Sequence, residues 1–91
     1  MSEVREVPER SLFEIRVGGE HAGRAEYELR SGRMVLTHTV VDDAHRGQGL
    51  AAQLARAALD AARERGLRVV PECSYIADYV AKHPEYADLV D

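Results

Sequence analysis

Residues 33–70 read RMVLTHTVVDDAHRGQGLAAQLARAALDAARERGLRVV, and their hydrophobic period changes from two to about 3.6 and then back. The first nine residues are rich in β-branched side chains and predict a strand over 33–41. From Leu50 onward apolar residues recur four apart, which predicts an amphipathic helix that Gly66 ends. The apolar run 67–70 follows at once and predicts a buried parallel strand that ends at Pro71. The stretch therefore predicts a right-handed strand–helix–strand unit.

Two antiparallel strands are expected before this unit. Phe13, Ile15 and Val17 alternate with polar residues, and Gly18-Gly19 then supplies the backbone freedom of a tight hairpin turn. A second alternating run, with Ala25, Tyr27 and Leu29 on one face, ends near Ser31-Gly32. Within 33–41 the same alternation predicts two faces: Met34, Leu36, His38 and Val40 on one, and Val35, Thr37, Thr39 and Val41 on the other.

The ends of the chain complete the predicted architecture. Residues 1–10 show no period and are expected to form a flexible arm, so that residues 11–91 make up the single domain. Ser74 is expected to cap a C-terminal helix that breaks before Pro84 and leads into one more short turn. The fold class is thus α/β with a mixed sheet: three antiparallel strands, a helix, a parallel strand and a C-terminal helix.

Length and composition exclude several classes of protein. The chain has 91 residues with 16 acids against 12 bases, which suits one small domain and disfavours duplex nucleic acid as a partner. No apolar run approaches the roughly 20 residues of a membrane helix, and the charged beginning is unlike a signal peptide, so a cytoplasmic protein is expected. The single cysteine, Cys73, permits no internal disulfide and no multi-cysteine zinc site, and no metal is expected.

The loop between the predicted strand and helix has the character of an anion site. Gly47 and Gly49 let the backbone approach a ligand, the helix start presents unpaired N–H groups, and Arg46 adds a charge whose fork matches phosphate oxygens. A simpler alternative is that the two glycines only shape a turn. The loop lacks the Gly-Lys-Ser/Thr ending of a Walker A motif and the third glycine of a dinucleotide fingerprint.

The loop resembles the Q/R-x-x-G-x-G/A pyrophosphate motif of the GNAT acyltransferases, here as Arg46-x-x-Gly49-x-Ala51. The ending of the chain is similar to that of a small subgroup, the minimal GNAT-like domains of about this length. The similarity spans residues 13–90. Its C-terminal part comprises residues 66–71, Cys73, Tyr75, Tyr79 and residues 83–86.

This resemblance implies a cofactor site for acetyl-CoA. It implies that the backbone of Val40 and Val41 meets the pantetheine arm. It further implies that six loop and helix residues wrap the pyrophosphate: Arg46, Gly47, Gln48, Gly49, Leu50 and Ala51. Full-size members have helices after their first strand that shape the acceptor pocket, whereas this chain has only tight turns there, so the acceptor site should be open.

Three side chains are candidates for the chemistry. His38 lies on the predicted pantetheine strand and Cys73 just past the end of the parallel strand, so the two are expected to approach each other. A cysteine beside a histidine and near a helix start is a competent nucleophile; the alternatives are a packed thiol and a half-buried histidine. The resemblance implies that Tyr79 protonates coenzyme A, although Tyr75 and Tyr79 are equally a packing pair.

The leading hypothesis is an acetyl-CoA-dependent N-acetyltransferase that acts on an unidentified amine of a small molecule or a protein, either directly or through an acyl group on Cys73. One alternative is a non-catalytic module that binds acetyl-CoA, coenzyme A or a protein partner through the same loop. A third reading, a purely structural interaction domain, predicts no affinity for coenzyme A.

Overall fold

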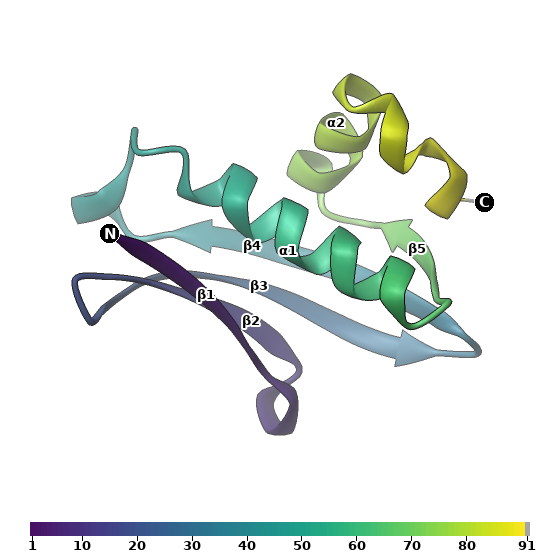
Figure 1. Cartoon of the computed structure of the whole chain (residues 1–91), viewed down its shortest axis with the longest axis horizontal. Helices are drawn as coiled ribbons and strands as arrows, with labels where there is room; N and C mark the ends of the chain where they lie inside the picture. The colour runs from purple at the N-terminus through teal and green to yellow at the C-terminus, as the bar shows by residue number, and fades with distance from the viewer. Residues whose placement is uncertain (91) are drawn as a thin grey trace.

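The computed structural model describes residues 1–90 and has one five-stranded sheet with a long helix across one face (Figure 1). The strands are β1 (Ser2–Val7), β2 (Leu12–Val17), β3 (Glu20–Arg30), β4 (Arg33–Val41) and β5 (Arg68–Pro71). The helices are α1 (Leu50–Glu64) and α2 (Ser74–Lys82), with 3-10 turns η1 (Pro8–Arg10), η2 (Asp43–His45) and η3 (Pro84–Leu89). The strand order follows the sequence; β1 to β4 are antiparallel and β5 is parallel to β4, which confirms the mixed α/β sheet.

The N-terminal segment differs from the prediction, because Ser2–Val7 forms an edge strand and not a flexible arm. The antiparallel part of the sheet therefore has four strands and not three. Val4 packs against the core, while Glu6 accepts a hydrogen bond from the hydroxyl of Tyr27 and pairs with Arg65 at the end of α1. This edge strand has few apolar residues, and charged residues separate them. Its sequence therefore shows no clear alternation from which a strand could be predicted.

Helix α1 supplies the central layer of the core. Its buried residues are Leu50, Leu54, Ala55, Ala58, Leu59 and Ala62, which is the face that the four-residue spacing predicted. The helix ends in a Schellman turn around Gly66 at φ +68°, where the amide of Leu67 donates to the carbonyl of Ala62 at 2.9 Å. The predicted end of the helix is confirmed, and the chain passes directly into β5.

A β-bulge in β4 exchanges the two faces of that strand. Tyr27 of β3 pairs with Leu36 while Glu26 pairs with His38, so Thr37 is the extra residue. Before the bulge Met34 and Leu36 are in the core; after it Val41 packs against the core, whereas His38 and Val40 are exposed. The predicted grouping of Met34, Leu36, His38 and Val40 on one face is therefore wrong beyond Leu36.

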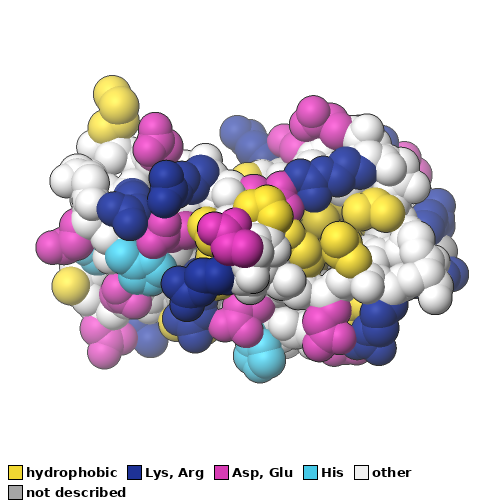
Figure 2. Space-filling view, turned by 90° about the horizontal axis from the view of Figure 1, so that it is seen from below, with side chains coloured by type: hydrophobic (Ala, Val, Ile, Leu, Met, Phe, Trp, Pro, Cys, Tyr) yellow, Lys and Arg dark blue, Asp and Glu magenta, His cyan; other side chains and the backbone are white. Residues whose placement is uncertain are grey.

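The face of the sheet away from α1 is polar. Figure 2 shows this side of the molecule, where basic, acidic and histidine side chains alternate over one half and a hydrophobic patch lies on the other. Ion pairs cross it, among them Arg16 with Glu14 and Arg24 with Glu26. A sheet of mainly antiparallel strands commonly packs its helices on one face and exposes the other face to solvent.

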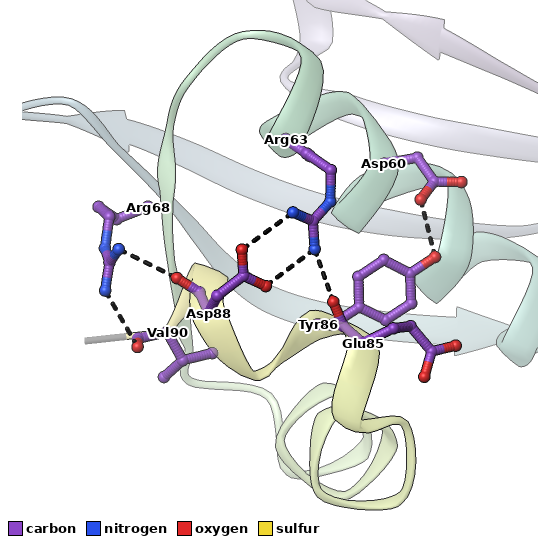
Figure 3. Close-up of polar contacts among 7 residues, drawn as sticks. All are labelled: Asp60, Arg63, Arg68, Glu85, Tyr86, Asp88 and Val90. Atoms are coloured by element: carbon purple, nitrogen blue, oxygen red, sulfur yellow. Dashed lines mark hydrogen bonds and ion pairs between the residues drawn. The ribbon is translucent and has the colours of Figure 1, made fainter.

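The C-terminal segment is tied to α1 and β5 by polar contacts (Figure 3). Arg63 of α1 makes a bidentate pair with Asp88, both bonds 2.9 Å, and the hydroxyl of Tyr86 donates to Asp60 at 2.7 Å. Arg68 donates to the backbone oxygens of Asp88 and Val90. These contacts hold η3, and with it α2, beside α1.

Helix α2 begins one residue away from the expected cap. Cys73 occupies the N-cap position, and Ser74 is the first helical residue. The amide of Cys73 donates to the carbonyl of Leu36 at 2.9 Å, which fixes the turn out of β5 and leaves the thiol at the helix start. The helix ends at Lys82, before Pro84, as predicted.

Candidate functional site

The far end of β4 has a free backbone edge. β4 pairs with β5 only from Arg33 to Leu36, against Arg68–Pro71, and the chain then turns away into α2. Within residues 1–90 no strand pairs with β4 on this side beyond Leu36. Val40 and Val41 lie in this free segment. Alternate residues of an antiparallel strand direct their N–H and C=O groups to the open side, where these groups suit an extended ligand that adds to the sheet edge.

The loop that follows β4 and η2 leaves the start of α1 without a cap. Gly47 and Gly49 adopt φ of +82° and +73°, and Gly49 is the N-cap residue. Among residues 1–90 no side-chain hydrogen bond caps this helix start, and the first turn contains no acidic residue. The free amides and the helix dipole therefore favour an anion at this point. Arg46 lies beside the loop and pairs with Asp43 at 2.8 Å.

The loop and the free edge of β4 border an open cavity of about 460 Å³. Its wall includes Thr39 of β4 and Tyr75 of α2. Among the residues expected to bind the cofactor, the structure places six around this cavity: Val41, Arg46, Gly47, Gly49, Leu50 and Ala51. Val40 and Gln48 do not line it. The cavity joins an anion-favouring end to a strand edge with free peptide groups.

The thiol of Cys73 lies one hydrogen bond from this cavity. Its Sγ is 3.6 Å from the hydroxyl oxygen of Thr39, which lines the wall. Burial raises the pKa of the thiol, but the backbone amide of Ile76, the Thr39 hydroxyl and the amide of Tyr75 outweigh it, so the pKa of Cys73 is lowered. A thiol at a helix start with a lowered pKa has enhanced thiolate character.

His38 does not meet Cys73 as expected. Its side chain is 70% exposed, and its Nδ1 is 3.7 Å from a carboxylate oxygen of Glu26. The bulge at Thr37 moves His38 to the polar face and brings Thr39 to the thiol instead. The expectation that the two side chains approach each other is therefore wrong, for a reason that strict alternation does not reveal.

Tyr79 lies in a neighbouring groove between α1 and α2, also of about 460 Å³. The residue is 8% exposed, and its ring stacks on that of His83 with the ring centres 3.8 Å apart. The ring centres of Tyr75 and Tyr79 lie 6.4 Å apart, and both residues line this groove. Tyr75 also lines the loop cavity. Tyr79 is thus part of an aromatic stack that adjoins the loop cavity through Tyr75.

Sequence reasoning missed two residues that shape the site. Thr39 was placed on the opposite face from His38, but nothing in the sequence marks the bulge that brings it to Cys73. His45 in η2 is mostly buried, and its Nε2 lies 2.9 Å from a carboxylate oxygen of Glu20, which ties the loop to the start of β3. Its place just before the Arg46 to Gly49 loop is the one signal that could have singled it out.

Potential metal ligands do not gather in the described residues: among 1–90 no group of three or more His, Cys, Asp or Glu side chains could hold an ion. None of the helices in the same range has the length and apolar character needed to cross a membrane.

Comparison with known proteins adds the relatives of this architecture. The family described as GCN5-related N-acetyl-transferase matches residues 12–89. Protein NATD1 of Mus musculus is 44% identical over 79 residues, which are 84% of this chain and 71% of that protein. Protein NATD1 of Homo sapiens is 45% identical over 78 residues, or 82% of this chain and 68% of that one.

Solved structures show the same fold. A GCN5-like putative N-acetyltransferase from Staphylococcus aureus superposes with a TM-score of 0.76 at 24% identity, covering 98% of this chain and 87% of its own. Ard1 from Thermoplasma volcanium superposes with a TM-score of 0.64 at 24% identity, covering 87% of this chain and 57% of its own.

Proposed function

Because the chain belongs to the GCN5-related N-acetyltransferase family, we propose that it transfers the acetyl group of acetyl-CoA to an amine. The observation that carries this proposal is the cavity where the uncapped start of α1 meets the free edge of β4, with the Cys73 thiol one hydrogen bond from its wall. An anion-favouring end and a row of free peptide groups fit the two chemically different parts of acetyl-CoA, its pyrophosphate and its amide-bearing arm.

The binding roles follow from these groups. The amides from Gly47 to Ala51 donate to the pyrophosphate, and the glycines leave the space in front of them open. Arg46 exchanges its surface pair with Asp43 for a phosphate oxygen, because its guanidinium fork matches that geometry. The free backbone of Val40 and Val41 pairs with the amides of the pantetheine arm as an added strand would.

The chemistry supplied by acetyl-CoA is an activated thioester. In the covalent route, Cys73 Sγ bonds to the acetyl carbonyl carbon as a thiolate while the bond from that carbon to the coenzyme sulfur breaks. The acceptor amine then attacks the S-acetyl group, the new C–N bond forms, and the Cys73 thiolate is released. In the direct route the amine attacks acetyl-CoA itself. In both routes Tyr79 is proposed to protonate the departing coenzyme thiolate. The amine proton passes to solvent, because His38 lies beside Glu26 on the polar face and not at the cavity.

Two measurements test the proposal in order. Isothermal titration with acetyl-CoA, with coenzyme A as competitor, should show saturable binding to the wild-type chain. Intact mass after incubation with acetyl-CoA should then show one added acetyl group that Cys73→Ala and Cys73→Ser both lack. If both variants keep full turnover with an amine, the covalent route is refuted and the direct route stands. Absence of any binding refutes the acetyltransferase proposal.

A non-catalytic module that binds acetyl-CoA or coenzyme A is the second candidate. The observation that favours it is the position of His38, which contacts Glu26 on the polar face and leaves Cys73 without the histidine partner expected of it. Saturable binding with neither an acetylated thiol nor turnover on a panel of small amines and peptide amines would assign this function. The cytoplasmic location expected from the sequence stays a prediction.

A further inference from the structure

A charged groove of about 710 Å³ lies on the polar face of the sheet, on the opposite side from α1. It crosses β1, η1, β2 and β3. Four arginines line it, namely Arg5, Arg10, Arg16 and Arg24, together with two glutamates, Glu14 and Glu26. None of these residues lines the cavity beside α1.

The groove is basic in an acidic protein. Its lining has four bases and two acids, while the rest of the chain has eight bases and fourteen acids. The lining therefore carries a positive formal charge. A positive charge concentrated in a hollow attracts negatively charged ligands and repels positive ones. The distribution of charge, more than its total, sets the groove apart from the remaining surface.

The arginines are more accessible than the glutamate at the centre. The side chain of Glu14 is 13% exposed, and it is held by Arg16 at 3.1 Å and His21 at 2.7 Å. Hydrogen bonds from His21 and then Arg16 lower the pKa of Glu14, so it stays ionised and its oxygens are already engaged. Arg5 lies 3.7 Å from Glu14 and is 63% exposed.

The side chain of Arg10 has no partner within the described residues. It is exposed at the end of η1 and makes neither a hydrogen bond nor an ion pair with any other residue of 1–90. The guanidinium groups of Arg5 and Arg10 can therefore bind an anion without first breaking a strong internal ion pair.

We propose that this groove binds an acidic peptide segment of a partner protein in an extended conformation. Guanidinium groups bind carboxylates through paired N–H donors, and Arg5 on β1, Arg10 at the end of η1 and Arg24 on β3 offer several such partners to one peptide. Val7 and Leu12 give the groove an apolar component for the stems of the ligand side chains. Glu26 accepts N–H groups that a peptide has and a phosphate backbone lacks.

The lining favours a peptide over a nucleic acid. Among the described residues no Phe, Tyr or Trp ring lines the groove, and its one imidazole, that of His21, is held by Glu14 at 2.7 Å, so bases lack the usual platform on which to stack. Two carboxylates in the groove and the acidic remainder of the chain would repel a continuous phosphate backbone. A short peptide with spaced carboxylates meets the arginines and avoids both penalties.

The test is fluorescence anisotropy with a labelled peptide of alternating Glu and Ser, blocked at both ends, on the full chain at low ionic strength. The same peptide with Lys in place of Glu and a single-stranded oligouridylate are the comparators. We expect saturable binding of the Glu peptide, a loss of about tenfold or more in affinity for the Arg5→Gln/Arg10→Gln double variant, and a steep fall with added salt. Arg56→Gln, an exposed arginine of α1 on the other side of the molecule, is the matched control and should stay within about twofold of wild type.

Three results would overturn the proposal: no binding of the Glu peptide at low ionic strength, equal affinity in wild type and double variant, or preference for the oligouridylate, which would assign the groove to nucleic acid. Circular dichroism checks that the double variant is folded, and Arg10→Glu serves as a second variant because Arg10 supports no internal contact. The assay contains no acetyl-CoA, so its outcome is independent of the proposed acetyl transfer.

Discussion

The loop before α1 permits a substitution that separates backbone strain from loss of cofactor binding. Gly49 has φ +73°, and Gly32 in the β3–β4 turn has φ +76°; a Cβ added at either position meets no atom within 4 Å. Gly49→Ala and Gly32→Ala therefore carry the same penalty, since an L residue in the left-handed region costs about 1–2 kcal/mol. For a domain of this size, that penalty lowers the melting temperature by roughly 5 to 15 °C.

The two variants should differ in affinity for acetyl-CoA. Gly49 lies at the cavity, and Gly32 precedes the opposite end of β4. An alanine methyl at position 49 enters the open space beside the cavity that Gly49 lines, where it would compete with a bound pyrophosphate, and a lost hydrogen bond to a charged group is worth about 1.5–3 kcal/mol. Isothermal titration should thus show affinity reduced by about tenfold or more in Gly49→Ala and unchanged in Gly32→Ala. Equal affinity of the two variants would refute the assignment of the loop to the pyrophosphate, and unequal melting temperatures would refute the strain argument.

Three further predictions concern the thiol, the edge strand and the close approach of two strands. Thr39→Val removes a hydroxyl that lowers the pKa of Cys73, so the pH profile of thiol alkylation should shift upward; an unchanged profile would contradict the contact. Glu6→Gln should destabilise the chain at neutral pH by roughly 1–2 kcal/mol in urea melts, because it breaks the pair with the arginine at the end of α1. The hydrogen bond from that arginine lowers the pKa of Glu6, so the carboxylate contributes to stability above the ordinary carboxyl range and this contribution is lost as the pH falls. The difference in stability between Glu6→Gln and wild type should therefore shrink in acid. A difference that stays constant with pH would refute the linkage. Gly23→Ala places a Cβ 2.6 Å from the backbone oxygen of Val40. It should therefore lower the free energy of unfolding by about 2 kcal/mol or more, and weaken acetyl-CoA binding by displacing β4. A neutral effect in thermal melts would contradict the register of β3 against β4.

Local patterns predicted most of the fold correctly. The apolar spacing from Leu50 to Ala62 and the glycine at 66 describe a helix whose buried face and C-terminal turn depend on residues within one segment. The edge strand Ser2–Val7 was not predicted, because its place in the sheet depends on pairing with β2 and on the contact of Glu6 with Tyr27, 21 residues away. The hydrophobic pattern of a short segment carries no information about contacts with residues so distant in the sequence.

The same distinction divides the two halves of the candidate site. The anion end is built from consecutive residues, Arg46 to Ala51, and its glycines can be read directly from the sequence. The thiol end depends on a bulge, since one extra residue at Thr37 decides whether His38 or Thr39 lies beside Cys73. A hydroxyl in that place stabilises a thiolate but cannot take its proton as an imidazole would. The covalent route therefore relies on the amides at the start of α2 to favour the thiolate form of Cys73, and removing the Thr39 hydroxyl should slow acetylation of the thiol without abolishing it.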